Sequence, residues 1–310
     1  MERVLGEIVL ISSTSFQARV DGRIVNAVIK GKRLKGQEDV RFELWDKKKV
    51  FFDNSLCVGD VVRLEFESES WKITERQQRE SSFVRYNFIK RKLQTIGSNF
   101  DMLCIIAPHN SPAMNSFFVN TTLMGLDGKC RIVFVFTKSD LEFSKDDENV
   151  IDAIDTAGFE SVRVSSKSGD NISVLREMVE SRTALFVGES GSGKSTLLNA
   201  LFCKDMQMVG ELSKKGNVGC HTTTSSVLLS DEKLRIIDTP GIRFVRPLSL
   251  KWDGVIACFP EFSKFQCRYA DCKHIGESGC KADEAAGRGI ISQVRLSDYR
   301  RMMETNDGKI

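Results

Sequence analysis

The stretch that decides the fold is Gly188-Glu189-Ser190-Gly191-Ser192-Gly193-Lys194-Ser195, which fits the pattern G-x-x-x-x-G-K-[ST]. An apolar strand pattern over 184–187 precedes it, and a helical pattern begins near Lys194. Glycines let backbone N–H groups converge on a phosphate without Cβ clashes, and the helix N-terminus adds a partial positive charge. The stretch therefore predicts a nucleotide phosphate loop in which Lys194 contacts the β- and γ-phosphates and Ser195 binds Mg²⁺.

Five short apolar runs, most of them separated by helical patterns, extend on both sides of this stretch. The runs are 103–106, 131–136, 161–164, 184–187 and 234–237. Runs of this length are typical of buried parallel strands in an α/β sheet. We therefore expect an α/β P-loop domain whose ligand site lies at the carboxyl ends of the strands.

The tetrapeptide Asp238-Thr239-Pro240-Gly241 follows the last of these runs. A carboxylate at a strand end can hold Mg²⁺ through water, and the Gly241 amide can sense a γ-phosphate. The same tetrapeptide is also an ordinary turn. Its position downstream of a phosphate loop favours the nucleotide interpretation, so Asp238 and Gly241 join the predicted site.

Two further segments, Thr137-Lys138-Ser139-Asp140 and Ser165-Ser166-Lys167, each end a strand run upstream of the phosphate loop. They resemble the guanine-reading N-K-x-D and S-A-K motifs of GTPases, with Thr137 in place of the usual Asn. The resemblance implies that Asp140 accepts hydrogen bonds from guanine N1 and N2. It also implies that Lys138 covers the ring plane and that the backbone of the second segment meets O6. Each segment alone is more often an ordinary loop at a strand end.

The order of these segments is inverted relative to ordinary GTPases, in which the phosphate loop comes first and the base-reading segments last. Here 137–140 and 165–167 precede the phosphate loop at 188–195, and Asp238 follows it. All of them end strands of one predicted sheet, so a circularly permuted chain can still build a single site. The predicted nucleotide-binding residues come from these segments and the first turn of the following helix: Thr137, Lys138, Ser139, Asp140, Ser165, Ser166, Lys167, Gly188, Glu189, Ser190, Gly191, Ser192, Gly193, Lys194, Ser195, Thr196, Asp238 and Gly241.

Over essentially its whole length the chain resembles the RsgA (YjeQ) family of ribosome small-subunit-dependent GTPases. Further matching segments are Asn99-Phe100-Asp101, before the first sheet strand, and Gly219-Cys220-His221-Thr222-Thr223-Thr224, at the position of the first switch. Cys220 stands where the family has Arg. The resemblance implies an N-terminal β-barrel of the OB-fold type, a circularly permuted GTPase domain and a small C-terminal zinc-binding helical domain. It also implies a GTP hydrolase that acts late in assembly of the small (30S) ribosomal subunit. This enzyme binds the rRNA of the subunit, and the subunit stimulates its GTP hydrolysis.

The residue after the D-T-P-G tetrapeptide is Ile242, whereas many GTPases orient the attacking water with a glutamine there. His221 is the candidate within the chain for this catalytic task, beside Lys194, because a neutral imidazole can accept a hydrogen bond from water. The sequence fits equally well with His221 being an ordinary surface-loop residue that has no catalytic role. The predicted Mg²⁺ ligands are Ser195, Asp238 and one hydroxyl from 222–224, among which Thr223 is narrowly preferred to Thr222 and Thr224.

Two other functions remain open from the sequence. The first is a nucleotide-dependent ribosome-binding switch with negligible hydrolysis, which Thr137 and Ile242 favour. The second is an ATPase, against which Asp140 argues, because adenine does not offer the hydrogen bonds of guanine N1 and N2. Under the leading hypothesis the cofactors are GTP or GDP, Mg²⁺ and one structural Zn²⁺.

Three cysteines and a histidine cluster near the C-terminus in the spacing Cys267-x4-Cys272-x-His274-x5-Cys280. Three thiolates and an imidazole form a complete tetrahedral set for structural Zn²⁺, with no position left open for catalysis. A helical pattern over 291–304 follows. The chain has nine cysteines and no signal-peptide pattern, so we expect a cytoplasmic protein whose cysteines are free thiols or metal ligands rather than disulfides.

The first part of the chain has a different pattern, with five short strand runs and no convincing helix. The runs are 6–11, 16–20, 24–29, 61–66 and 71–73. They predict a small closed barrel, and an OB-fold and an SH3-like barrel both fit the pattern. The charged segment 30–49 is expected to be a mobile loop. Residues 1–92 hold 19 Lys and Arg against 14 Asp and Glu, a surplus that permits phosphate contacts.

Length and composition fit a multi-domain globular protein. The 310 residues are 41% hydrophobic and 28% charged, and no run approaches the roughly 20 apolar residues that cross a bilayer. We expect an OB-fold RNA-binding domain at 1–85, a circularly permuted GTPase domain at 93–247 and a zinc-binding domain at 248–310. The expected partners of this monomer are the small ribosomal subunit and its rRNA, and not a membrane.

Overall fold

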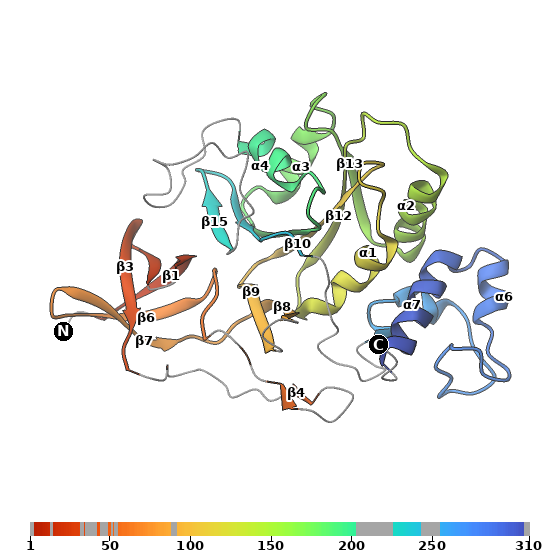
Figure 1. The fold of residues 1–310 in the computed structure, drawn as a ribbon, viewed down its shortest axis with the longest axis horizontal. Helices are drawn as coiled ribbons and strands as arrows, with labels where there is room; N and C mark the ends of the chain where they lie inside the picture. The colour runs from red at the N-terminus through yellow and green to blue at the C-terminus, as the bar shows by residue number, and fades with distance from the viewer. Residues whose placement is uncertain are drawn as a thin grey trace.

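The computed structural model describes residues 3–12, 15–31, 34, 42–43, 49–50, 52, 55–87, 92–202, 226–242 and 255–306 (Figure 1). The segment 30–49, predicted to be a mobile loop, lies mostly outside these residues. Its described parts include two short strands, β4 (Phe42–Glu43) and β5 (Lys49–Val50), which pair antiparallel. No helix in the described ranges is long and apolar enough to span a membrane.

Five strands at the N-terminal end form a closed barrel, at the left of Figure 1. They are β1 (Arg3–Ile11), β2 (Phe16–Val20), β3 (Arg23–Ile29), β6 (Val61–Glu67) and β7 (Ser70–Arg76). The pairing order is β1-β2-β3-β7-β6, and β6 returns to β1. The β3–β7 contact is parallel and the others are antiparallel, which is the OB-fold arrangement and not the SH3-like one. The predicted barrel is confirmed, with all five of its strand runs.

The barrel interior is built by the alternation of side chains along its strands. In β6, Val62 and Leu64 are fully buried, whereas Val61 and Arg63 are partly exposed. The buried residues join Ile8 of β1 in one apolar cluster. A shift of one residue in the register would therefore turn the barrel core toward solvent.

The barrel continues into a main sheet through β1, whose Leu10 pairs with Val227 of the edge strand β15. The order across the main sheet is β13 (Glu160–Val164), β12 (Arg131–Thr137), β10 (Met102–Pro108), β14 (Thr183–Gly188), β16 (Arg235–Asp238) and β15 (Val227–Ser230). The first five strands are parallel, and β15 runs antiparallel to β16. The five strands predicted for this sheet are confirmed, and β15 is an additional strand.

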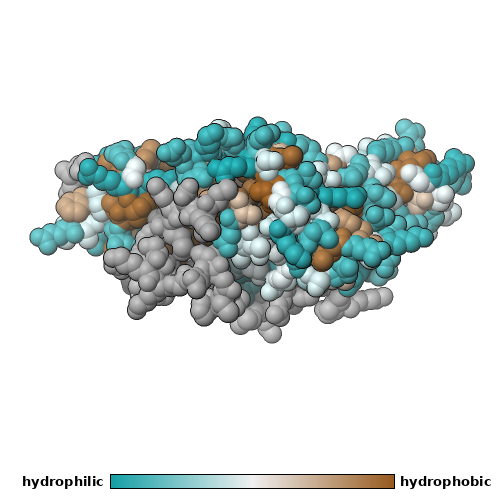
Figure 2. All heavy atoms as spheres, turned by 90° about the horizontal axis from the view of Figure 1, so that it is seen from above, coloured by the Kyte–Doolittle hydropathy of each residue, from teal (hydrophilic) through white to brown (hydrophobic). Residues whose placement is uncertain are grey.

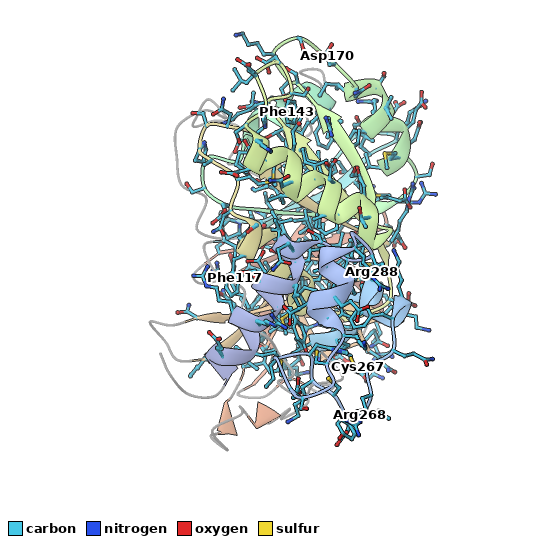
Figure 3. All side chains as sticks on the ribbon, turned by 90° about the vertical axis from the view of Figure 1, so that its right-hand side faces the viewer. Phe117, Phe143, Asp170, Cys267, Arg268 and Arg288 are labelled. Carbon is cyan, nitrogen blue, oxygen red and sulfur yellow. The ribbon has the colours of Figure 1, made fainter. Side chains whose placement is uncertain are left out.

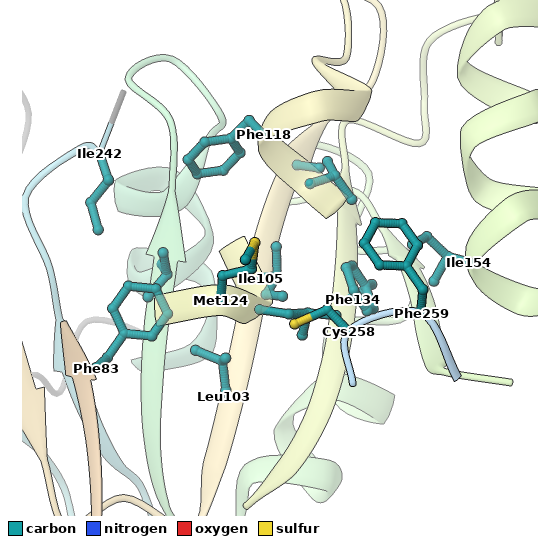
Figure 4. Packing of buried hydrophobic residues seen from close by; sticks show 14 of the residues in the cluster. Phe83, Leu103, Ile105, Phe118, Met124, Phe134, Ile154, Ile242, Cys258 and Phe259 are labelled. Atoms are coloured by element: carbon teal, nitrogen blue, oxygen red, sulfur yellow. The ribbon is translucent and has the colours of Figure 1, made fainter. Parts of the chain in front are cut away.

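Helices cover both faces of the main sheet. They are α1 (Ser116–Thr122), which continues into the 3-10 helix η1 (Leu123–Gly125), α2 (Lys145–Ala157), α3 (Ile172–Val179) and α4 (Lys194–Phe202). On one face, α1 and α2 share an apolar cluster with Leu103 and Ile105 of β10 (Figure 4). On the other face, α3 and α4 share a second cluster with Cys104 and Ile106. The sheet is therefore buried on both sides, as a doubly wound α/β fold requires.

A three-stranded sheet lies between the barrel and the main sheet. Its order is β11 (Leu126–Gly128), β8 (Ser81–Asn87) and β9 (Lys92–Ser98). Asp60, which is fully buried, accepts hydrogen bonds from Arg79 at 2.7 and 2.8 Å and from the Ser98 hydroxyl at 2.8 Å. This buried ion pair fastens the barrel to the three-stranded sheet. The domain bounds 1–85 and 93–247 stay predictions.

The C-terminal part packs against α1 and α2 (Figure 3). It contains the 3-10 helix η3 (Pro260–Lys264) and the helices α6 (Ala282–Gly287) and α7 (Gln293–Asn306). Phe259 and Tyr299 extend the apolar cluster of α1 and α2 into this part. The helical pattern predicted over 291–304 is confirmed by α7, and the domain bounds 248–310 stay a prediction.

Exposed large apolar side chains are dispersed over the described surface. Leu5, Ile24, Val28 and Phe66 lie on the barrel, Val174 lies on α3, and Tyr269, Ile275 and Ile290 lie in the C-terminal part. Figure 2 shows hydrophobic groups separated by hydrophilic atoms on the face that it presents. Dispersed residues of this kind are normal on a protein surface and require no partner.

Candidate nucleotide site and metal centre

The phosphate loop, residues 188–195, connects the end of β14 to the start of α4. Gly191 and Gly193 have φ angles of 82° and 85°, which L side chains rarely adopt. A Cβ at Gly193 would also lie 3.3 Å from Thr137 Oγ1. The Ser192 hydroxyl is buried and has no hydrogen-bond partner among the described residues, so it is available to an anionic ligand. These features fit a phosphate loop.

Lys194 and Asp238, which were predicted from separate segments, are in direct contact. Lys194 begins α4, its side chain is buried, and its ammonium group donates to the Asp238 carboxylate and the Thr239 carbonyl oxygen. Burial raises the pKa of Asp238, and the charge of Lys194 opposes that shift. The carboxylate predicted to hold Mg²⁺ therefore lies beside the phosphate loop, and Ser195 and Thr196 are exposed on α4.

The D-T-P-G tetrapeptide packs directly on the phosphate loop. A Cβ at Gly241 would lie 3.1 Å from the Ser190 nitrogen, and the Ile242 N–H donates to the Gly188 carbonyl oxygen over 3.0 Å. The Ile242 side chain is 1% exposed and belongs to the apolar cluster shown in Figure 4. An apolar side chain directed into the core does not orient a water molecule, which agrees with the expectation from sequence.

The segments 137–140 and 165–167 lie at the carboxyl ends of the neighbouring strands β12 and β13, and they contact each other at this edge of the sheet. The Ser165 hydroxyl donates to Asp140 Oδ1 over 2.7 Å, and the Lys167 ammonium lies 3.8 Å from Asp140 Oδ2. The hydrogen bond from Ser165 lowers the pKa of Asp140. Ser165 is fully buried and orients the Asp140 carboxylate, a role that the sequence did not assign to it.

The first two residues of the 137–140 segment reach the phosphate loop. Thr137 Oγ1 donates to the Ser192 carbonyl oxygen over 2.5 Å. Lys138 donates to the carbonyl oxygens of Gly191, over 3.1 Å, and Ser111. Because β10 separates β12 from β14, these contacts pass over the end of β10. The predicted phosphate and base segments therefore form one continuous site.

One partner of the phosphate loop was not predicted from the sequence. Asn115 caps the N-terminus of α1 by accepting from the Phe118 N–H, and its Nδ2 donates to Glu189 Oε1 over 3.1 Å. Burial raises the pKa of the Glu189 carboxyl group. An asparagine before a helical pattern is a recognisable cap signal, but its second hydrogen bond depends on the tertiary fold.

The predicted first switch lies outside the described residues. It contains His221, the candidate for orienting water, and Thr223, the predicted Mg²⁺ ligand, as well as Cys220. Their roles stay predictions. The described chain resumes at Ser226, whose hydroxyl donates to the Ile96 carbonyl oxygen of β9 over 2.6 Å, and continues into β15.

The four residues predicted to bind zinc come together in the C-terminal part. One ligand atom from each of Cys267, Cys272, His274 and Cys280 lies within 4.8 Å of all the others. Cys267 Sγ lies 3.4 Å from His274 Nδ1. Tetrahedral Zn²⁺ with Zn–S bonds of about 2.3 Å requires sulfur atoms roughly 3.8 Å apart, so the donor set and its spacing fit this ion.

Helix α7 holds the loop that carries these four residues. The Tyr299 hydroxyl donates to the Lys273 carbonyl oxygen over 2.6 Å, and Arg300 Nε donates to the His274 carbonyl oxygen over 3.1 Å. Figure 3 shows Cys267 in this loop, beside the C-terminal helices. The cluster is therefore anchored through its backbone to the same helix that packs on α1 and α2.

A phosphate loop, a D-T-P-G turn and two strand-end segments with the base-reading pattern share one sheet edge, in inverted chain order. Together they define a circularly permuted P-loop GTPase. The sequence model of the RsgA GTPase family matches residues 76–246, more than half of the chain, and the chain belongs to this family. It is accordingly an enzyme that hydrolyses GTP to GDP and phosphate with Mg²⁺.

Curated relatives extend the match over nearly the whole chain. Small ribosomal subunit biogenesis GTPase RsgA 2 of Bacteroides thetaiotaomicron is 30% identical over 298 residues, covering 93% of this chain and 92% of that protein. Small ribosomal subunit biogenesis GTPase RsgA of Borreliella afzelii is 31% identical over 252 residues, covering 80% of this chain and 82% of that protein.

Two solved structures share the fold. YjeQ from Thermotoga maritima aligns over 100% of both chains, with a TM-score of 0.70 and 23% identity. YloQ, described as a circularly permuted GTPase, covers 100% of this chain and 96% of its own, with a TM-score of 0.65 and 18% identity. The predicted fold class, a barrel followed by a permuted GTPase sheet and a C-terminal cysteine–histidine cluster, is confirmed.

Proposed function

We propose that the protein assists assembly of the small (30S) ribosomal subunit, where it binds rRNA and hydrolyses GTP. Its relatives in Bacteroides thetaiotaomicron and Borreliella afzelii are named small ribosomal subunit biogenesis GTPases. The observation that carries the proposal is the extent of the similarity. The match to the Bacteroides thetaiotaomicron protein spans 93% of the chain and so includes the barrel and the C-terminal cluster. A protein that shared only nucleotide chemistry would match over the GTPase sheet alone.

The barrel is the proposed rRNA-binding element. OB barrels bind nucleic acids through their grooves and loops. Residues 1–92 carry 19 Lys and Arg against 14 Asp and Glu, and this excess of positive charge favours contacts with RNA phosphates. The protein works there as a monomer in the cytoplasm, the compartment where subunits are assembled.

The nucleotide lies across the carboxyl ends of the parallel strands, with its phosphates in the phosphate loop. With a nucleotide bound, Lys194 would leave Asp238 and contact the phosphates, and the Asp238 carboxylate would hold Mg²⁺ together with Ser195 and Thr223. Mg²⁺ held by these residues would neutralise negative charge on the phosphates. Asp140, held by Ser165, accepts the guanine N1 and N2 hydrogen bonds.

Hydrolysis needs a group that orients the attacking water, and Ile242 is buried in the core. His221 of the first switch or a group of the ribosomal subunit fills this role. Turnover is therefore slow in the free protein and rises when the subunit orders the switch. A nucleotide-dependent binding switch with negligible hydrolysis is the second candidate function, and the same burial of Ile242 favours it.

One structural Zn²⁺ completes the proposal. Its ligands are Cys267, Cys272, His274 and Cys280, whose donor atoms lie within 4.8 Å of one another. Four protein ligands leave no coordination position for a substrate, so the ion stabilises the loop. It substitutes for the apolar core that so short a segment cannot build.

Phosphate release from GTP by the full chain, with and without purified small subunits, tests the proposal. Strong stimulation that vanishes in Lys194→Ala supports a GTPase that acts on the subunit. Lys233→Ala is the matched control, because Lys233 is exposed and forms a surface ion pair with Glu180 over 2.9 Å. If the protein still binds GTP but small subunits do not raise its rate of phosphate release, the proposal that the ribosomal subunit is its partner is contradicted. If His221→Ala keeps the full turnover stimulated by the subunit, a group of the subunit and not His221 orients the attacking water.

A further inference from the structure

The Thr137 hydroxyl is committed to the phosphate loop. Thr137 ends β12 and is 3% exposed. In the described structure its Oγ1 has two hydrogen-bond neighbours, the Ser192 carbonyl oxygen at 2.5 Å and the Ala107 carbonyl oxygen at 3.4 Å. Both are acceptors without a proton to give, and a hydroxyl has a single proton. Thr137 therefore donates its proton to Ser192 and keeps no donor for a ligand.

An asparagine at this position, as in the N-K-x-D pattern, behaves differently. Its side-chain amide has two N–H bonds, so one can hold the Ser192 carbonyl oxygen while the other donates to a base. The edge of guanine that carries N7 and O6 offers only acceptors. Thr137 thus preserves the bond to the phosphate loop and removes the side-chain donor that N7 requires.

The described side chains beside Thr137 do not replace that donor. The Lys138 ammonium group uses two of its three N–H bonds on the carbonyl oxygens of Ser111 and Gly191. Its expected place is over the face of the base, out of line with N7, and Asp140 is an acceptor. We infer that no described side chain of this site reads guanine N7: base selection rests on Asp140 at the N1–N2 edge, and Thr137 positions the phosphate loop. The inference rests on the proposed role of Asp140 in reading the base.

Equilibrium binding of GDP and 7-deaza-GDP to the full chain tests the inference, because a C–H group replaces N7 in the analogue. The wild-type chain is expected to bind both with affinities within about twofold. Thr137→Asn is expected to bind GDP about three- to tenfold more tightly than 7-deaza-GDP, since one further hydrogen bond then reaches N7. A larger wild-type preference for GDP, or no preference in Thr137→Asn, overturns the inference.

Two further variants separate positioning from base contact. Thr137→Ser keeps the hydroxyl and should reproduce the wild-type pattern. Thr137→Val keeps the shape but loses the bond to Ser192, so it should weaken GDP and 7-deaza-GDP binding equally. Unequal weakening in Thr137→Val would mean that the hydroxyl touches the base, and would overturn the positioning role.

The role of Asp140 is tested by a separate ligand, xanthosine diphosphate. Its 2-oxo group accepts a hydrogen bond, whereas the 2-amino group of guanine donates one. Asp140→Asn supplies an amide donor, so the variant should bind xanthosine diphosphate more tightly than GDP, whereas the wild-type chain should prefer GDP. Failure of this exchange refutes the role of Asp140, while the comparison of GDP with 7-deaza-GDP alone decides whether N7 is read.

Discussion

Arg295 Nη1 donates a hydrogen bond to Asn120 Oδ1 over 2.8 Å, which fastens the last helix, α7, to α1 beside the main sheet. Arg295 is fully buried, and its other donors meet the Glu261 carboxylate and the Cys258 carbonyl oxygen. The same helix α1 is capped at its N-terminus by Asn115, which holds the phosphate loop through its side-chain amide. One short helix therefore contacts the C-terminal part near one end and the nucleotide site at the other.

Arg295→Ala should lower the free energy of unfolding by about 3–5 kcal/mol, because it leaves the buried Glu261 carboxylate without a partner. Urea unfolding followed by circular dichroism measures the change. Arg288→Ala is the control, since Arg288 is exposed and pairs with Glu284 at the surface. This control should leave stability nearly unchanged. Equal stability of the two variants would show that the buried ion pair does not stabilise the docked helix.

Asn115→Ser should weaken GDP binding by about threefold, the effect of one modest hydrogen bond. Serine still caps α1, but it is too short to reach Glu189, so the variant removes the contact and keeps the helix. Titration with a fluorescent GDP analogue gives the affinity. Glu189→Gln is the matched control, because its carbonyl oxygen still accepts from Asn115. Wild-type affinity in Asn115→Ser would contradict a role for this contact in ordering the phosphate loop.

Local sequence patterns predicted most of the main sheet. The run 103–106 identifies β10, because a strand buried on both faces needs apolar residues at successive positions. The strand Val227–Ser230 escaped detection because it is short and ends in a polar residue. Its place depends on pairing with β16 and, through Leu10, with the barrel. Pairing of that kind is a property of the tertiary fold and leaves no local pattern.

Candidate residues of the site could be identified where a motif requires a residue type at a strand end or in the loop that follows the strand. Lys194 and Asp238 were identified separately, and the fold brings them into contact. The bonds that join the segments were not predictable, among them the one from Thr137 to Ser192. These bonds depend on the order β12-β10-β14 across the sheet, which places distant segments side by side.

Gly59→Ala should destabilise the joint between the barrel and the three-stranded sheet by more than about 3 kcal/mol. A Cβ at Gly59 would lie 2.0 Å from the Ser98 carbonyl oxygen, so the backbone must move. Gly22→Ala is the matched control, because Gly22 has a φ of 78° but no atom within 4 Å of its added Cβ. It isolates the conformational penalty, about 1–2 kcal/mol. Equal losses in urea unfolding would contradict the close approach to Ser98.

Zinc removal should release the C-terminal loop from α7, because structural Zn²⁺ supplies about 10 kcal/mol or more to the folding of such loops. Elemental analysis should find one Zn²⁺ per chain in the purified wild-type protein and no Zn²⁺ in Cys267→Ser. Hydrogen exchange should then become faster across the loop whose carbonyl oxygens bind Tyr299 and Arg300. Cys130→Ser is the matched control, since Cys130 is a partly exposed free cysteine outside the cluster, and it should keep both zinc and protection. Full zinc content in Cys267→Ser would refute the ligand assignment, and unchanged exchange in a zinc-free chain would refute the structural role.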